Sequence, residues 1–147
     1  MTNVTLAQAS TIVDAALEKG AALGLAPLTV AVLDTGGHLV AFKREDKSGI
    51  LRADIAFGKA WGALGMGFGS REIANRAAKM PVFFTALTTI SNGRLVPVPG
   101  GVLILDRSLG LVGAVGISGD TSDQDEICAI AGIEAAGLVA QPGAPAE

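Results

Sequence analysis

The sequence predicts an α/β domain of the α+β type, built on a five-stranded, mostly antiparallel sheet flanked by helices. Three observations lead to this fold class. The 147 residues are 50% hydrophobic with a mean hydropathy of +0.50, which suits one domain with one buried core. Apolar residues recur at helical spacing in several segments. Short apolar runs follow one another across tight glycine turns, and strands joined in that way are antiparallel.

The chain opens with a predicted helix and hairpin. Thr5-x-x-Gln8 has the spacing of a capping box, and the apolar periodicity after it predicts a helix over residues 6–23. Residues 28–33 form a β-branched run that ends in the glycine turn of residues 34–37. Residues 38–42 then form the returning strand of the hairpin.

Two helices are predicted in the middle of the chain. The first covers about residues 50–67, is apolar on two sides and contains several glycines. Because an interior glycine costs a helix about 1 kcal/mol, we expect a neighbour to pack closely against its backbone. Ser70 is predicted to cap the next helix, which runs through Lys79 and ends at Pro81.

The last third of the chain is predicted to hold three strands and a helix, after an ambiguous stretch at residues 82–93. Residues 95–99 allow an edge strand at best, because their two prolines cannot donate to a ladder. Residues 102–105 and 111–117 are predicted to be strands.

The acidic run of residues 120–126 places negative charge at the start of a final helix, which reaches about residue 138. The predicted order is therefore α-β-β-α-α-β-β-β-α. We expect a single domain over residues 1–140 and a mobile tail over residues 141–147, which is rich in proline and alanine.

Composition excludes several classes of function. The net charge is −3 and the basic residues form no stripe, which argues against a nucleic-acid partner. No apolar run is long enough for a membrane span, and the first residues lack the pattern of a signal peptide, so we expect a cytoplasmic protein without membrane contact. One cysteine and one histidine give no metal-ligand cluster. With only 17% charged residues, part of the surface is expected to be buried in a homo-oligomer.

Five stretches, taken in order, resemble the GlcG/HbpS family, which includes the C-terminal domain of PduO-type proteins. They are residues 30–40, 56–60, 99–104, 113–119 and 123–126. The resemblance implies a profilin-like fold, a homo-oligomer, and haem or a related tetrapyrrole as the ligand of some members. Other members are encoded with catabolic enzymes. The family's haem-binding members place a histidine or another donor on an early helix, and the first predicted helix of this chain has none.

Lys59 is the first candidate for a functional site. It falls on an apolar stripe of the second predicted helix, where an ammonium must reach solvent or a carboxylate. It can anchor an anionic ligand, transfer a proton, or form a structural salt bridge. Asp34 either holds its own turn or pairs with Lys59 or Arg44, and Asp125 is the family-motif carboxylate expected to face a pocket.

Further residues are candidates for ligand binding. The glycine turns at Gly100, Gly101 and Gly119 either direct backbone amides, with Ser118, at an anion or simply turn the chain. For haem, the available axial donors are His38, Met66, Met80 and Cys128. Of these, Met66 lies on the glycine-rich helix.

Two functions follow from these residues. The first is a binding protein for haem or another hydrophobic, acid-bearing molecule, held by a carboxylate contact to Lys59. The second is a small cofactor-free catabolic enzyme, of the isomerase, tautomerase, hydratase, lyase or hydrolase kind. In that case Lys59, with Asp34 or Asp125, would transfer protons. One histidine in a hairpin does not make a Ser-His-Asp triad.

Overall fold

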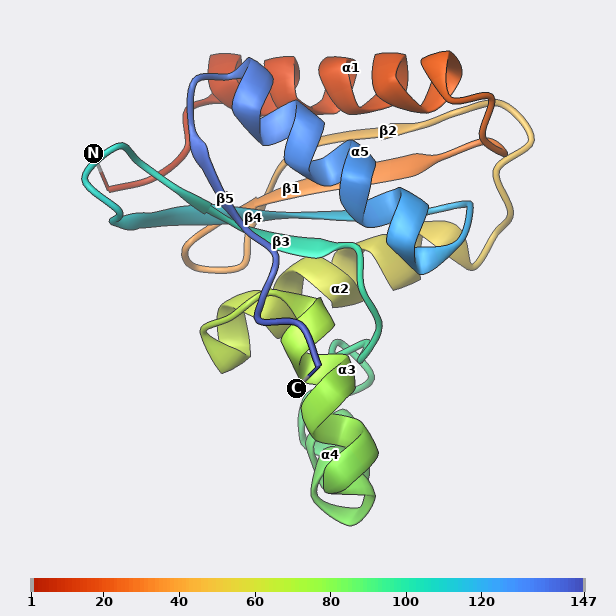
Figure 1. Cartoon of the computed structure of the whole chain (residues 1–147), viewed down its shortest axis with the longest axis vertical. Helices are drawn as coiled ribbons and strands as arrows, with labels where there is room; N and C mark the ends of the chain where they lie inside the picture. The colour runs from red at the N-terminus through yellow and green to blue at the C-terminus, as the bar shows by residue number, and fades with distance from the viewer. Residues whose placement is uncertain (1, 147) are drawn as a thin grey trace.

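The structure is a computed structural model that describes residues 2–146. These residues form five helices and five strands (Figure 1), which follow one another in this order: α1 (Leu6–Ala22), β1 (Thr29–Asp34), β2 (Leu39–Arg44), α2 (Arg52–Met66), α3 (Ser70–Lys79), α4 (Pro81–Ile90), β3 (Gly101–Leu105), β4 (Leu111–Ser118), α5 (Ser122–Ala135) and β5 (Val139–Gln141).

The five strands form one sheet in the order β2-β1-β4-β3-β5, and every neighbouring pair is antiparallel. The predicted α+β class is therefore confirmed. Helices α1 and α5 cover one face of the sheet, and α2 crosses the other face (Figure 1). The interior strand β1 is buried on both faces: Val30 and Val32 join the core under α1 and α5, whereas Leu33 packs with Ala60 and Ala63 of α2.

The predicted strand at residues 95–99 does not form. This segment runs along α2 instead, where Val96 N–H donates to the carbonyl of Gly58 over 3.3 Å. A Cβ on Gly58 or Gly62 would press on Val96 and Leu95, so the close neighbour expected from the glycines of α2 is present. Prolines 97 and 99 explain the absence of a ladder, because they lack the N–H that a strand must donate.

The fifth strand of the sheet is β5, in a part of the chain for which no strand was predicted. Gln141, the expected start of the mobile tail, is its last residue. Beyond it, Pro142 and Ala144 form backbone hydrogen bonds with Arg71 N–H and the Glu72 carboxylate of α3. The amide of Asn75 also donates to the carbonyl of Ala144.

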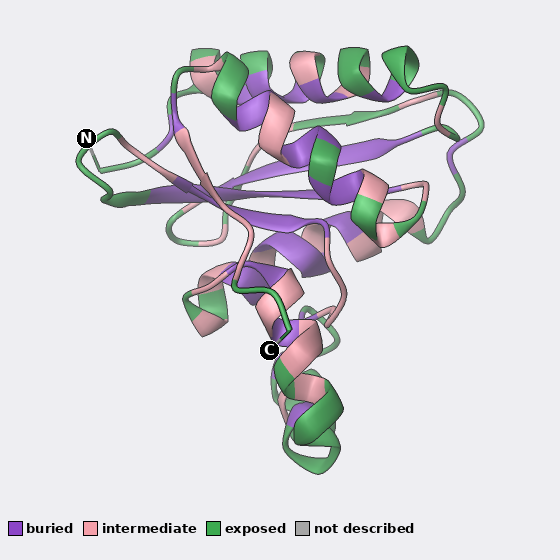
Figure 2. Ribbon diagram, viewed as in Figure 1, coloured by how far each residue is buried: buried purple, intermediate pink, exposed green. Residues whose placement is uncertain are grey.

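Helices α3 and α4 project from the α2 side of the sheet, with α4 farthest from the strands (Figure 1). We call residues 70–94 the helical arm. The ambiguous segment 82–93 is mostly α4, which starts with Pro81 in its first turn. Phe84 is the buried residue of α4 and packs with Ile73 and Leu95, while most of α4 is exposed (Figure 2).

Candidate functional site

A buried ion pair joins α2 to the start of α5. The Lys59 side chain is 2% exposed and that of Asp125 is 1% exposed. Lys59 Nζ donates to the carbonyl oxygen of Ile117 at 2.8 Å and to Asp125 Oδ2 at 3.2 Å. The other carboxylate oxygen of Asp125 accepts from Asp120 N–H at 3.1 Å. Lys59 Nζ and both carboxylate oxygens of Asp125 therefore each have a hydrogen-bond partner, as buried charged groups require.

Burial is the main influence on both members of the pair. Removal from water lowers the pKa of Lys59 and raises the pKa of Asp125, and the attraction between them opposes both shifts without cancelling them. Arg52, two helical turns before Lys59, also lowers the pKa of the lysine by like-charge repulsion. A lysine and a carboxylate with pKa values moved toward one another have the electrostatics of a proton-transfer pair, or of a buried structural one.

Glycines bring the backbone close to this pair. Gly100 has a φ of 118°, and a Cβ there would lie 2.8 Å from Lys59 Nζ. Gly101 N–H donates to the hydroxyl of Ser70 at 2.7 Å, and a Cβ on Gly101 would overlap the Lys59 carbonyl. The predicted role of Ser70 as a helix cap is wrong, because Gly69 is the N-cap residue and the Ser70 hydroxyl bonds the Gly101 backbone instead.

Ser118 and Gly119 follow at the end of β4. The buried hydroxyl of Ser118 accepts from Arg52 at 3.1 Å, and Gly119 packs against the carbonyl of Pro27. Sequence reasoning missed Arg52. The signal was its spacing of seven residues from Lys59, which places both side chains on one face of α2.

Asp34 lies at the other end of the sheet. It pairs with Gly113 across the ladder, whereas Ser118 pairs with Thr29. Asp34 Oδ1 accepts from Gly36 N–H at 2.9 Å and His38 N–H at 3.0 Å, and it lies 3.0 Å from His38 Nδ1. Asp34 therefore holds its own turn and does not meet Lys59 or Arg44. Partial burial would raise its pKa, but the hydrogen bonds from His38 and Gly36 outweigh burial and lower it.

The imidazole of His38 is 80% exposed. The Asp34 carboxylate can only accept a hydrogen bond, so in the neutral ring Nδ1 carries the hydrogen and Nε2 carries a lone pair. The same arrangement orients many metal-bound histidines. Beside this turn lies a hollow of about 150 Å³, lined by Thr35, Gly36, Gly37, Trp61, Leu64 and Gly65.

Arg94 lies over the ring of Trp61, with its guanidinium carbon 4.1 Å from the ring centroid. This cation–π contact places a positive charge beside the apolar wall of the hollow. The sequence did not indicate Arg94, because the two residues are 33 positions apart and only the segment folded back along α2 brings them together.

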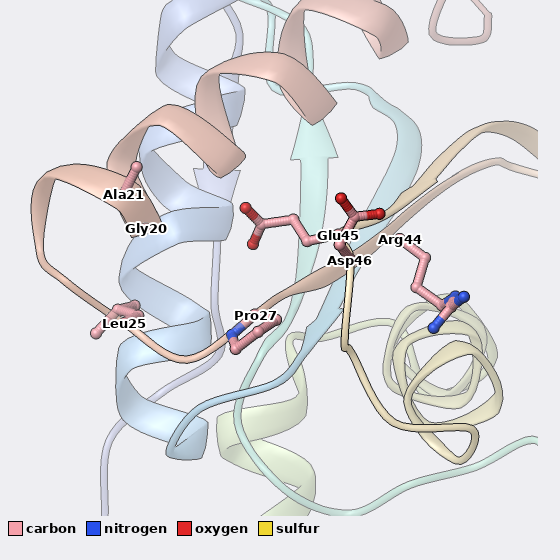
Figure 3. A pocket seen from close by; sticks show the side chains of 7 residues that line it. All are labelled: Gly20, Ala21, Leu25, Pro27, Arg44, Glu45 and Asp46. Atoms are coloured by element: carbon pink, nitrogen blue, oxygen red, sulfur yellow. The ribbon is translucent and has the colours of Figure 1, made fainter.

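Arg44 and Met66 belong to neither cluster. Arg44 Nη1 donates to the carbonyl of Ser48. It borders an open hollow of about 570 Å³ near the end of α1, where its guanidinium points away from the Glu45 carboxylate (Figure 3). Met66 is half-buried at the end of α2 and packs against the cluster of Ile73, Phe84 and Leu95.

The candidate residues thus divide between two places. Lys59, Asp125, Gly100, Gly101 and Ser118 meet in a buried polar cluster, and Asp34 and His38 form an exposed pair at the hairpin turn. Within residues 2–146 no helix is long and apolar enough to cross a bilayer. The same residues contain no group of three or more His, Cys, Asp or Glu that could hold a metal ion.

Known proteins share both the sequence pattern and this fold. An uncharacterized 15.0 kDa protein of the dhaT–dhaS intergenic region of Citrobacter freundii is 29% identical over 86% of this chain and 87% of its own length. HbpS of Streptomyces reticuli, in the structure of a double mutant, is 28% identical with a TM-score of 0.78, over 91% of this chain and 87% of that one.

The crystal structure of a PduOC:heme complex has a TM-score of 0.83 at 24% identity, covering 92% of this chain and 96% of that chain, which shows a shared fold. The family described as "Haem degrading protein HbpS-like" matches residues 4–134, which include both clusters of candidate residues. This protein therefore belongs to the HbpS-like family.

Proposed function

We propose that the protein binds haem or a similar hydrophobic, acid-bearing molecule at the hairpin turn, with His38 as the axial donor. The observation that carries this proposal is the exposed imidazole whose Nδ1 is engaged by Asp34. A carboxylate in that position fixes the tautomer and the orientation of the ring, as in many metal-bound histidines. The family description and the haem complex of the related fold support the choice of ligand.

The other donors fit haem less well. Burial raises the pKa of the Cys128 thiol to about 11, so the thiolate that haem iron prefers is scarce at neutral pH. Met66 is packed within a hydrophobic cluster. Met80 is exposed, but it lies where α3 meets α4, in the helical arm. His38 is thus the donor that combines exposure with a positioning partner.

The surroundings of His38 suit the rest of such a ligand. Gly37 contacts the Trp61 indole so closely that a Cβ would lie 3.0 Å from it, which leaves an aromatic wall beside the turn. Arg94 on that wall can meet a carboxylate of the ligand, as guanidinium groups do well. Lys59 is the less accessible anchor, because its ammonium is buried and bonded to Asp125. When bound, haem would supply redox and ligand-binding chemistry at its iron.

Haemin titration tests this proposal. We expect a Soret shift at one haemin per chain with a five-coordinate spectrum, because His38 is one donor. His38→Ala should abolish the shift and Arg94→Ala should weaken binding, while Met80→Leu, which removes an exposed thioether elsewhere, should leave it unchanged. A spectrum that is the same in wild type and His38→Ala would contradict the proposal.

The buried Lys59–Asp125 pair favours a second candidate function, a cofactor-free enzyme that transfers protons. In it, Lys59 would take or give a proton at the carbon next to the carbonyl of a small keto acid. Deuterium incorporation into pyruvate or oxaloacetate, followed by NMR, would detect such a step. The rate should disappear in Lys59→Met, and an unchanged rate in that variant would exclude the role of Lys59.

We also propose that the protein acts as a homo-oligomer. Only 17% of its residues are charged, and exposed large apolar residues occur on several elements, including Ile50, Leu51, Val82 and Ile90. Light scattering at micromolar concentration should give a multiple of the chain mass of 14.7 kDa, and a mass equal to that of one chain would contradict this proposal.

A further inference from the structure

Helix α4 has the surface of a protein interface. Val82 is 84% exposed, Phe83 50% and Ile90 75%, and no residue between 80 and 93 is charged. A helix of a folded monomer normally turns a polar face to water. Only Phe84 anchors α4 to the rest of the arm as a buried side chain, so its other faces are left without a partner.

Charge is distributed unevenly along the chain. Of its 11 basic and 14 acidic residues, three basic and no acidic residues lie between positions 73 and 105, which leaves eight basic against 14 acidic residues elsewhere. Arg76 pairs with Glu72 and Arg94 lies over Trp61 of α2, so the positive charge at the outer part of the helical arm is that of Lys79, whereas the body of the molecule is negative. Lys79 is exposed immediately before α4.

The body contains an apolar hollow that could receive such a helix. It has a volume of about 290 Å³ and lies between β2 and α2, lined by Ala31, Leu39, Phe42, Ala53, Asp54 and Phe57. Leu39 and Phe42 are exposed on the edge strand β2, and Asp54 places an exposed carboxylate at the rim. The hollow therefore offers an apolar floor and a negative charge.

We infer that α4 of one copy docks into the β2–α2 hollow of a second copy of this chain. Charge complementarity supports this occupant: an exposed lysine beside an apolar helix and an exposed carboxylate at the rim of an apolar hollow both occur in every copy. Val82 and Phe83 would supply the apolar contact and Lys79 would meet Asp54. When two copies exchange arms reciprocally, the contact closes as a two-fold dimer. The inference rests on the proposed homo-oligomer and does not depend on haem binding.

Light scattering of charge-reversal variants tests the pairing. Lys79→Glu and Asp54→Lys should each shift the protein toward monomer, and the Lys79→Glu/Asp54→Lys double variant should recover the wild-type mass. Val82→Ser/Phe83→Ser should also give monomer, whereas Leu6→Ser, at another exposed apolar position, should keep the wild-type mass. All four side chains of the arm and hollow are exposed, so circular dichroism should show that each variant stays folded.

Three results would overturn the inference. A Val82→Ser/Phe83→Ser variant that keeps the wild-type mass would show that α4 is not in the interface. A double charge reversal that fails to recover the assembly would show that Lys79 and Asp54 do not meet. A monomeric wild-type protein that floats with phosphatidylglycerol vesicles would assign the arm to an anionic lipid surface instead.

Discussion

Lys59 shows how far residue patterns reach in this chain. Its place on an apolar helical stripe predicted that it must find a carboxylate, and Asp125 is that carboxylate. Asp34, the alternative partner, does not pair with Lys59. Its carboxylate accepts hydrogen bonds within its own turn, at the far end of the β1–β4 ladder. Turn chemistry is local and therefore readable, whereas the end of the sheet at which a loop lies depends on the topology.

Removing the charge of Lys59 should destabilise the fold. Lys59→Met keeps the apolar stem but leaves Asp125 buried without its cation, and breaking such a pair costs about 3–5 kcal/mol of unfolding free energy. Urea denaturation measures the loss. Lys59→Met/Asp125→Asn should recover much of it, because both charges are then absent. Wild-type stability in Lys59→Met would instead support the proton-transfer role.

Cys128 should be inert in the folded protein. Its thiol is buried on α5 and its pKa is raised to about 11, so at pH 8 roughly one thiol in a thousand is ionised even before access is considered. We expect no reaction with iodoacetamide at pH 8 until urea unfolds the chain. Rapid labelling under native conditions would show that α5 opens locally, which its packing against α1 argues against.

At the scale of elements, hydrophobic periodicity predicted the helix α1 that packs on the sheet better than it predicted the edge strand β5. Helix α1 begins at the predicted capping box and ends within one residue of the expected position. The edge strand is different: residues 95–99 have apolar character but lack two N–H groups, whereas residues 139–141 are too few to produce an alternating pattern. Helix α4 was not predicted because its apolar residues are not confined to one face, so its sequence has no amphipathic stripe. The structure leaves several of these side chains exposed.

Gly116, at the contact between α2 and the sheet, and Gly65, on the exposed side of α2, should respond oppositely to alanine. A Cβ on Gly116 of β4 would overlap the carbonyl of Ala56, so Gly116→Ala must push α2 off the sheet and should cost about 3 kcal/mol or more. A Cβ on Gly65 would meet its nearest atom, in Trp61, at 3.7 Å, and Gly65→Ala should stabilise the helix by about 0.5–1 kcal/mol. Thermal unfolding measures both, and equal effects would contradict the close approach of α2.

At the scale of the whole molecule, the chain beyond β5 ties the helical arm to the sheet. Gln141 Oε1 accepts from Gly69 N–H at 3.1 Å, and Pro142 and Ala144 bond α3. Arg71 extends this connection by pairing with Asp123 and Glu126 of α5. The sequence indicated a mobile tail because proline and glycine interrupt regular elements, but it could not show that the irregular backbone meets unpaired groups at the start of α3.

A truncation tests whether this connection matters for the arm. Ending the chain at Gln141 removes the acceptor of Arg71 N–H, the backbone donor to Glu72 and the acceptor of the Asn75 amide, while β5 stays intact. Each lost hydrogen bond contributes about 1 kcal/mol, so we expect the unfolding free energy to fall by about 2–3 kcal/mol. Hydrogen exchange should rise at the first amides of α3 and stay unchanged in β1 and β4, which the tail does not touch.

Replacing Glu72 by Gln, which keeps an acceptor for Ala144 N–H but removes the charge that pairs with Arg76, is the matched control and should leave the Arg71 amide protected. Equal exchange in the full-length and truncated proteins would mean that residues 142–147 are mobile in solution, as their composition alone predicts, and that α3 is held to the sheet by Arg71 and its carboxylates.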